Sequence, residues 1–246
     1  MAVSFVKSRG LRGRWDWGAI AASANMSTPL RGALPTVDGR SATQPPEIAL
    51  WADVESSSLQ RLLLAALESF AELGYFGTTT REIAKRAQMS PAGIYSHYTS
   101  KADLLYEIIR AAHVFMRERM LTAFAQSATP TKRLANLVAT HVEVHAELRR
   151  SARVANYELH ALPDNRRSEI VALRREMHGV MREAIRLGME ARDFYVEDLE
   201  ATTVAVLSLG IDVSRWFEIG KRLTPEELGA IYARLVLRTV CAKSEP

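Results

Sequence analysis

Apolar side chains recur at steps of three and four residues along most of the chain beyond residue 56. This spacing puts them on one face of an α-helix, whereas the alternation expected of a half-buried strand is rare here. The sequence therefore predicts an all-α fold of about nine helices whose apolar faces meet in a common core. The first such series consists of Leu59, Leu62, Leu63, Leu67, Phe70 and Leu73.

Hydroxyl side chains mark the starts of several helices. The segment Thr79–Glu82 has the pattern of a capping box, in which the threonine hydroxyl and the glutamate carboxylate each bind a backbone N–H of the helix start. Ser90–Pro91 and Ser100 mark two further starts. These signals predict short helices at about Thr80–Gln88 and Pro91–Tyr98, followed by a long helix. Two short helices this close together form a helix-turn-helix unit, whose second helix fits the major groove of DNA.

The composition excludes several classes of protein. A chain of 246 residues is long enough for one domain or two small ones. The single cysteine, Cys241, allows no intrachain disulfide, which is typical of the reducing cytoplasm. The longest nearly uncharged apolar stretch, residues 201–211, is too short to span a membrane, so no membrane partner is predicted. The net charge of +4 is by itself weak evidence for a nucleic-acid partner.

The sequence lacks the motifs of catalysis and cofactor binding. It contains no phosphate-binding loop, no dinucleotide glycine fingerprint and no nucleophile constellation. His141 and His145 are one helical turn apart with Glu143 between them, which is not the spacing of zinc hydrolases, and core or surface histidines are the favoured interpretation. We therefore predict no enzymatic activity, no cofactor and no metal site.

Residues 1–50 differ in composition from the rest of the chain. Basic residues outnumber acidic ones, and prolines and glycines interrupt any helical period. We interpret this segment as a disordered basic arm, which can add non-specific attraction to DNA phosphates. Two plainer interpretations stay open, namely an extension without a role or a start assigned too early, with Met26 as the first residue.

Three stretches, Phe70–Tyr75, Thr79–Ala84 and Ser90–Leu105, carry a specific pattern. Together they resemble, without a gap, the DNA-binding domain of the tetracycline-repressor-like (TetR) family. The resemblance implies that a DNA-binding domain occupies residues 51–102 and that a ligand-binding and dimerisation domain occupies residues 103–246. It also implies a homodimer that binds a double-stranded DNA operator and responds to a small-molecule effector.

The same resemblance implies which side chains meet DNA. Hydroxyls and an arginine at a helix start suit phosphate, and small residues in the second short helix let its backbone approach the duplex. Gln88 stands where the family usually has a turn glycine, so a positive φ is expected there. Ala92 and Gly93 also depart from the family pattern, and Gly93 lacks a hydroxyl that is common at its position. Tyr98 is expected in the core. The predicted DNA-binding residues are Thr79, Thr80, Arg81, Pro91, Ala92, Gly93, Tyr95, Ser96, His97 and Lys101.

The C-terminal half predicts an interface and a pocket. A helix from about Leu199 to Phe217 is apolar nearly all round, as expected of a helix that faces its own core on one side and a second subunit on the other. Adaptable apolar side chains and nearby arginines predict a ligand site, with plain core packing as the alternative. Residues 212–217 and 223–226 resemble the acyl-CoA-responsive branch of the family. The predicted ligand-binding residues are Phe115, Met116, Met120, Arg153, Tyr157, Arg215 and Trp216.

These inferences predict a sequence-specific transcriptional regulator. The favoured form is a repressor that a small apolar ligand, such as an acyl-CoA thioester, releases from a palindromic operator. Two alternatives stay open: an activator of the same fold, and a helical small-molecule-binding protein without a role at DNA.

Overall fold

The computed structural model describes residues 45–220 and 222–241, which all lie in the unit Leu34–Pro246. In this part of the chain nine α-helices and two 3-10 helices follow one another without a strand, which confirms the predicted all-α fold. The predicted arm lies outside the described residues as far as residue 44. The elements are η2 (Pro46–Trp51), α2 (Ser57–Gly77), α3 (Thr80–Arg86), α4 (Pro91–Tyr95), α5 (Lys101–Ala125), α6 (Pro130–Glu147), α7 (Arg149–Tyr157), η3 (Leu159–Ala161), α8 (Asp164–Glu190), α9 (Leu199–Trp216) and α10 (Pro225–Cys241).

The predicted caps are confirmed at three helix starts, and the structure shows a fourth cap at Thr224. The Thr79 hydroxyl accepts a hydrogen bond from the backbone N–H of Glu82 at 3.2 Å, and Ser90 and Ser100 cap α4 and α5 in the same way. Thr224 makes a complete capping box, since its hydroxyl accepts from the N–H of Glu227 and that carboxylate accepts from the N–H of Thr224. These bonds satisfy backbone donors that have no partner inside the helix, and they fix where each helix begins.

The end of α2 is kinked at Gly74. This glycine has a φ of 71°, and one further helical turn follows it as far as Gly77. The buried hydroxyl of Thr78 then donates to the carbonyls of Ser69 and Gly74, at 3.0 and 2.8 Å. The last turn therefore stays packed on α2 in spite of the kink, because the Thr78 hydroxyl is hydrogen-bonded to two carbonyls of that helix.

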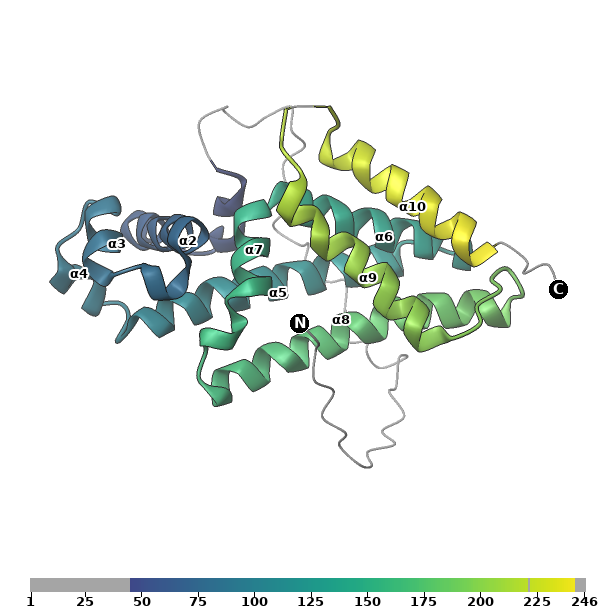
Figure 1. Ribbon diagram of the computed structural model, residues 1–246, viewed down its shortest axis with the longest axis horizontal. Helices are drawn as coiled ribbons and strands as arrows, with labels where there is room; N and C mark the ends of the chain where they lie inside the picture. Colours follow the sequence, from purple (N-terminus) through teal and green to yellow (C-terminus); the bar gives the residue numbers. More distant parts are fainter. Residues whose placement is uncertain (1–44, 221, 242–246) are drawn as a thin grey trace. The chain divides into compact units, whose positions relative to one another are not determined.

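One core joins the first helices to the C-terminal part of the chain. Ile83 of α3 and Ile94 of α4 are fully buried, together with Leu104 and Ile108 from the first half of α5. Val154 of α7 belongs to the same buried cluster. Figure 1 shows α5 leading from the group of α2, α3 and α4 into the remaining helices. The predicted domain boundary at residues 102 and 103 falls in the first turn of this helix, so any movement of α5 reaches both parts.

Residues 46–50, which the sequence analysis assigns to the arm, form part of the folded unit. They make most of η2, in which Glu47 and Trp51 are buried. The prolines that suggested disorder are compatible with this element, because Pro46 occupies its first position, where the missing N–H costs nothing. Gln60 of α2 donates to the carbonyls of Trp51 and Val54 and holds η2 against the helix.

Helices α9 and α10 both pack against α6 and leave their outer faces uncovered in the single chain. In α9 the buried positions include Val206, Gly210 and Val213, whereas Val204 and Leu209 are 45% and 48% exposed. The packing on α6 is close, since a Cβ on Gly210 would lie 2.2 Å from the ring of His141. None of the described helices has the length and apolar character needed to cross a membrane.

Candidate nucleic-acid interface and effector cleft

Helices α3 and α4 form a tight pair around a turn with positive φ. Gln88 lies in this turn at a φ of 55°, as predicted from its place in the family pattern. The backbone N–H of Met89 donates to the carbonyl of Ala84 at 2.9 Å and closes the turn. Because Ile83 and Ile94 are both fully buried, the two helices are held at a fixed angle with their other faces outward.

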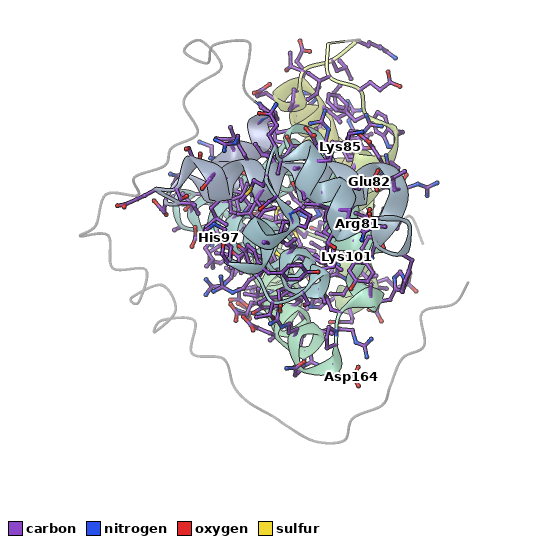
Figure 2. The ribbon with its side chains drawn as sticks, turned by 90° about the vertical axis from the view of Figure 1, so that its left-hand side faces the viewer. Arg81, Glu82, Lys85, His97, Lys101 and Asp164 are labelled. Carbon is purple, nitrogen blue, oxygen red and sulfur yellow. The ribbon has the colours of Figure 1, made fainter. Side chains whose placement is uncertain are left out.

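All ten residues predicted to meet DNA lie at the surface. Seven are exposed, and Thr80, Gly93 and Lys101 are half-buried. Figure 2 looks onto the end of the molecule formed by α2, α3 and α4, where Arg81, His97 and Lys101 are labelled. The structure thus brings the predicted side chains together on one accessible end, as contact with a duplex requires.

Tyr95 stands out on the exposed face of α4. Its side chain is 54% exposed, and its hydroxyl lies 3.5 Å from the Thr80 hydroxyl at the start of α3. This contact orients the ring between the two helices. Tyr98, three residues later, packs against the core, and burial raises its pKa to about 12, in agreement with its predicted core position.

Lys101 has a structural role in addition to its predicted place at DNA. Its Nζ donates to the carbonyls of Tyr75 and Thr78, at 2.7 and 2.6 Å, and lies 4.2 Å from the centre of the Tyr75 ring. These carbonyls lie at the end of α2, where the helix supplies few partners for them. The lysine therefore fastens the start of α5 to the end of α2.

Replacing Lys101 by methionine is expected to lower stability and operator affinity together. The methionine keeps most of the apolar stem but donates no hydrogen bond, so the free energy of unfolding should fall by about 1 kcal/mol. Urea denaturation measures this change. Arg81→Met is the matched control, because Arg81 is exposed on α3, and it should weaken operator binding without loss of stability. Equal stability of both variants would contradict the fastening role of Lys101.

One basic residue of this surface was not predicted. Lys85 is exposed on α3, one helical turn after Arg81, so both cations share a face. The spacing of four residues between Arg81 and Lys85 could have predicted that both side chains lie on the same face of the helix. Arg86 follows it but turns away from that face, since it pairs with Glu72 at 2.6 Å and with Glu68 at 3.5 Å.

A cleft of about 310 Å³ opens where α2, α7 and α9 meet. It brings together three of the predicted ligand residues, Arg153, Tyr157 and Arg215. Ala71, Val154 and Glu158 complete its lining. Arg153 makes no hydrogen bond or ion pair with the residues that the structure describes. The cleft thus offers a free guanidinium and an exposed tyrosine to a ligand.

The other predicted ligand residues lie elsewhere. Met120 is fully buried and Met116 is 6% exposed, and both face the core from α5. Phe115 is half-buried on the same helix. Trp216 follows Arg215 at the end of α9 and is 48% exposed, with its ring against Phe217. The structure therefore does not gather the seven residues into one pocket.

The pair α3–α4, with its buried joint and exposed polar face, defines a helix-turn-helix DNA-binding protein. Residues 62–108 match the family model described as bacterial regulatory proteins, tetR family, and residues 127–240 match the model described as the tetracyclin repressor-like C-terminal domain. The chain belongs to the TetR family and is a DNA-binding transcriptional regulator, not an enzyme.

Known proteins similar to this chain support the assignment. A regulatory protein of the tetR family from Rhodococcus RHA1, known from its crystal structure, is 40% identical in sequence to this chain. The match covers 76% of this chain and all of the Rhodococcus chain, with a TM-score of 0.72. The transcriptional repressor KstR2 of Mycobacterium tuberculosis is 26% identical over 203 residues, which are 72% of this chain and 89% of KstR2. The structure of AibR with isovaleryl coenzyme A and operator DNA, 21% identical over 75% of this chain and 98% of that one, shares the fold with a TM-score of 0.66.

Proposed function

We propose that the protein is a homodimeric repressor that binds a palindromic operator and leaves it when a small-molecule effector binds. The observation that carries this proposal is the exposed polar face of α3 and α4 on a chain whose α9 and α10 leave apolar side chains uncovered. A two-fold dimer would present two copies of α4 to successive major grooves, about 34–36 Å apart. In this proposal residues 51–102 bind DNA, and residues 103–246 bind the effector and the second subunit.

The uncovered faces of α9 and α10 support the dimer. Val204 and Leu209 of α9 and Leu235 of α10 are 45%, 48% and 51% exposed in the single chain. Large apolar side chains gathered on one side of a protein usually mark a protein interface. Four helices, two from each subunit, would bury them.

The ten exposed or half-buried residues at the α3–α4 end are proposed as the DNA contacts. The start of α3 offers hydroxyls, free backbone N–H groups and Arg81 to phosphates. Tyr95 and the small residues of α4 would lie against base edges in the major groove. The residues proposed for this surface are Thr79, Thr80, Arg81, Pro91, Ala92, Gly93, Tyr95, Ser96, His97 and Lys101.

We propose an acyl-CoA thioester as the effector, bound at the cleft of Arg153, Tyr157 and Arg215. Guanidinium groups bind phosphate in a two-pronged geometry, and coenzyme A carries three phosphates. The volume of the cleft is at the lower end of ligand pockets, which suits one part of a larger ligand. That AibR, which has the same fold, was crystallised with isovaleryl coenzyme A and operator DNA supports this choice.

A transcriptional activator of the same fold is the alternative, because helix-turn-helix contacts do not depend on the sign of regulation. The name of KstR2 favours repression. A helical small-molecule-binding protein without a role at DNA would make no use of the exposed face of α3 and α4. In vitro transcription from a promoter that carries the operator separates repression from activation.

Selection of bound sequences from random duplex DNA tests the proposal directly. We expect an inverted repeat to be enriched, and operator affinity to fall steeply as salt increases, since phosphate contacts release counterions. A protein that enriches no inverted repeat at moderate salt would overturn the assignment.

Tyr95→Ala is expected to weaken operator binding about tenfold or more and to leave the oligomeric state unchanged. The substitution removes a groove contact and the link to Thr80, and a lost base contact costs about 1–3 kcal/mol. Fluorescence anisotropy with labelled operator measures the affinity. Tyr195→Ala is the matched control, because Tyr195 is a similarly exposed tyrosine remote from α4, and it should bind like the wild type. Unchanged affinity of the Tyr95 variant would remove this residue from the interface.

A further inference from the structure

A second hollow, of about 150 Å³, lies beside the cleft and shares Ala71 and Arg153 with it. Its other lining residues, among those that the structure describes, come from α2 and α7. Glu68 and Glu72 of α2 form one side, and Arg149 and Arg150 of the first turn of α7 form the other. Acidic and basic side chains thus face each other across a space that is open to the larger cleft.

The arginines of this hollow are weakly engaged. Arg150 is 52% exposed and reaches Glu68 only at 3.9 Å, while Arg153 has no partner among the described residues. Arg149 uses its Nε on the carbonyl of Ser214 at 3.2 Å. The first turn of α7 also lacks a side-chain cap, so its positive end adds to the field of the three guanidinium groups. Most of their donors are therefore available to an incoming anion.

The carboxylates opposite them hold the helix-turn-helix unit. Glu72 pairs with Arg86 through two hydrogen bonds, of 2.6 and 3.0 Å, and Glu68 lies 3.5 Å from the same guanidinium. Arg86 is the last residue of α3. A continuous set of charges therefore runs from Arg150 on α7, through Glu68 on α2, to Arg86 at the end of α3.

The start of α7 is also held by a backbone hydrogen bond that does not involve the Arg150 side chain. The buried carboxyl of Glu47 in η2 receives a hydrogen bond from the backbone N–H of Arg150, and burial raises the pKa of this carboxyl. An anion that attracts the Arg150 side chain can thus exchange its partner without displacing the helix. The exchange is cheap, since a half-exposed ion pair contributes little to stability.

We propose that the second hollow binds phosphate groups of the effector, which take Arg150 away from Glu68 and so lower operator affinity. This inference rests on the proposed function, because it describes how the effector at the cleft acts on α3. Once Arg150 has left, Arg86 is the remaining cation beside Glu68, so the balance of its pairing with Glu68 and Glu72, which positions α3, changes. A diphosphate is a better partner for three guanidinium groups than one carboxylate is, because it carries more negative charge and offers more oxygens to their paired N–H donors.

Calorimetry without DNA tests the site, with inorganic pyrophosphate and free coenzyme A as probes. Arg150→Gln should bind both probes about tenfold more weakly, because a charge-assisted hydrogen bond is lost. Glu68→Gln should bind them about two- to fivefold more tightly, because the competing carboxylate is gone. Arg182→Gln, a similarly exposed arginine on α8 that pairs with Glu200, is the matched control and should bind like the wild type.

The two probes also distinguish the source of the phosphate. Coenzyme A binding at least tenfold tighter than pyrophosphate would identify a nucleotide-bearing effector, and equal affinities would identify a simple phosphate ligand. Equal affinities of wild type and Arg150→Gln, or unchanged binding by Glu68→Gln, would overturn the proposed exchange. These measurements need no operator. A negative result would therefore reject the phosphate site alone, whereas the selection of an inverted repeat tests the proposed function.

Discussion

Replacing Leu209 by arginine is expected to convert the dimer into monomers and to abolish tight operator binding. Leu209 lies on the uncovered face of α9, and in a two-fold interface the substitution places two unpaired charges in an apolar contact. Burying each without a partner costs several kcal/mol. The dissociation constant of the dimer should therefore rise by about a thousandfold or more. A single helix-turn-helix unit would then contact only one half-site.

Analytical ultracentrifugation at micromolar concentration measures the oligomeric state, and anisotropy with labelled operator measures DNA binding. Leu73→Arg is the matched control, because Leu73 is 46% exposed but belongs to α2 and not to the uncovered faces of α9 and α10. This variant should remain a dimer. A Leu209→Arg protein that stays dimeric and binds the operator would show that the uncovered face of α9 is not the subunit interface.

The parts of the fold that the sequence predicted well depend on neighbours in the chain. The caps at Thr79, Ser90 and Ser100 act over three residues, so the pattern alone places the start of each helix. The positive φ of Gln88 was expected from the resemblance, because the family usually has a turn glycine at this position. The ends of helices were less predictable. The helix expected at Pro91–Tyr98 ends at Tyr95, because no similar local signal specifies a C-terminus there.

The candidate sites depend instead on residues far apart in the sequence. The cleft joins α2, α7 and α9, and periodicity does not say which helix faces meet. The sequence predicted a ligand site from apolar side chains and nearby arginines, but the opposing Glu68 and its contact with Arg86 appear only in the fold. The apolar residues Met116 and Met120 show the opposite case. A methionine side chain suits a pocket wall and a core equally, and in the structure both are buried in the core.

Three buried histidines form a polar group in the core. His113 of α5 and His141 and His145 of α6 are each 5% exposed. Nδ1 of His113 donates to the carbonyl of Ile109, and its Nε2 accepts from Nε of Arg174. His145 donates to the carbonyl of His141, whose own Nε2 donates to Leu207. The ring of His113 is therefore neutral, because its Nε2 accepts from a guanidinium, and Nδ1 of His141 has no hydrogen-bond partner among the described residues.

Stability is expected to fall steeply between pH 7 and pH 5 because these rings resist protonation. Burial lowers the pKa of His113 and of His141 to about 4, and burial together with repulsion from His141 lowers the pKa of His145 well below its ordinary value. Below the ordinary pKa of about 6.5 the unfolded chain takes up protons that the folded chain excludes. Stability is thus fully present above pH 6.5 and is lost as the pH falls towards 4. Each histidine contributes up to about 1.4 kcal/mol for every pH unit in this window.

Urea denaturation at intervals from pH 7.5 to pH 5 measures the effect, which should reach several kcal/mol, a large share of a typical folding free energy. His113→Gln removes one of the three titrations and should reduce the slope by about a third. His160→Gln, which replaces an exposed histidine, should keep the slope of the wild type. Since the His113 variant can lose stability for packing reasons, NMR titration of the wild-type imidazoles gives a second measurement. Three rings that stay neutral in the folded protein at pH 5 would support the mechanism, and rings that protonate near pH 6.5 without unfolding would contradict it.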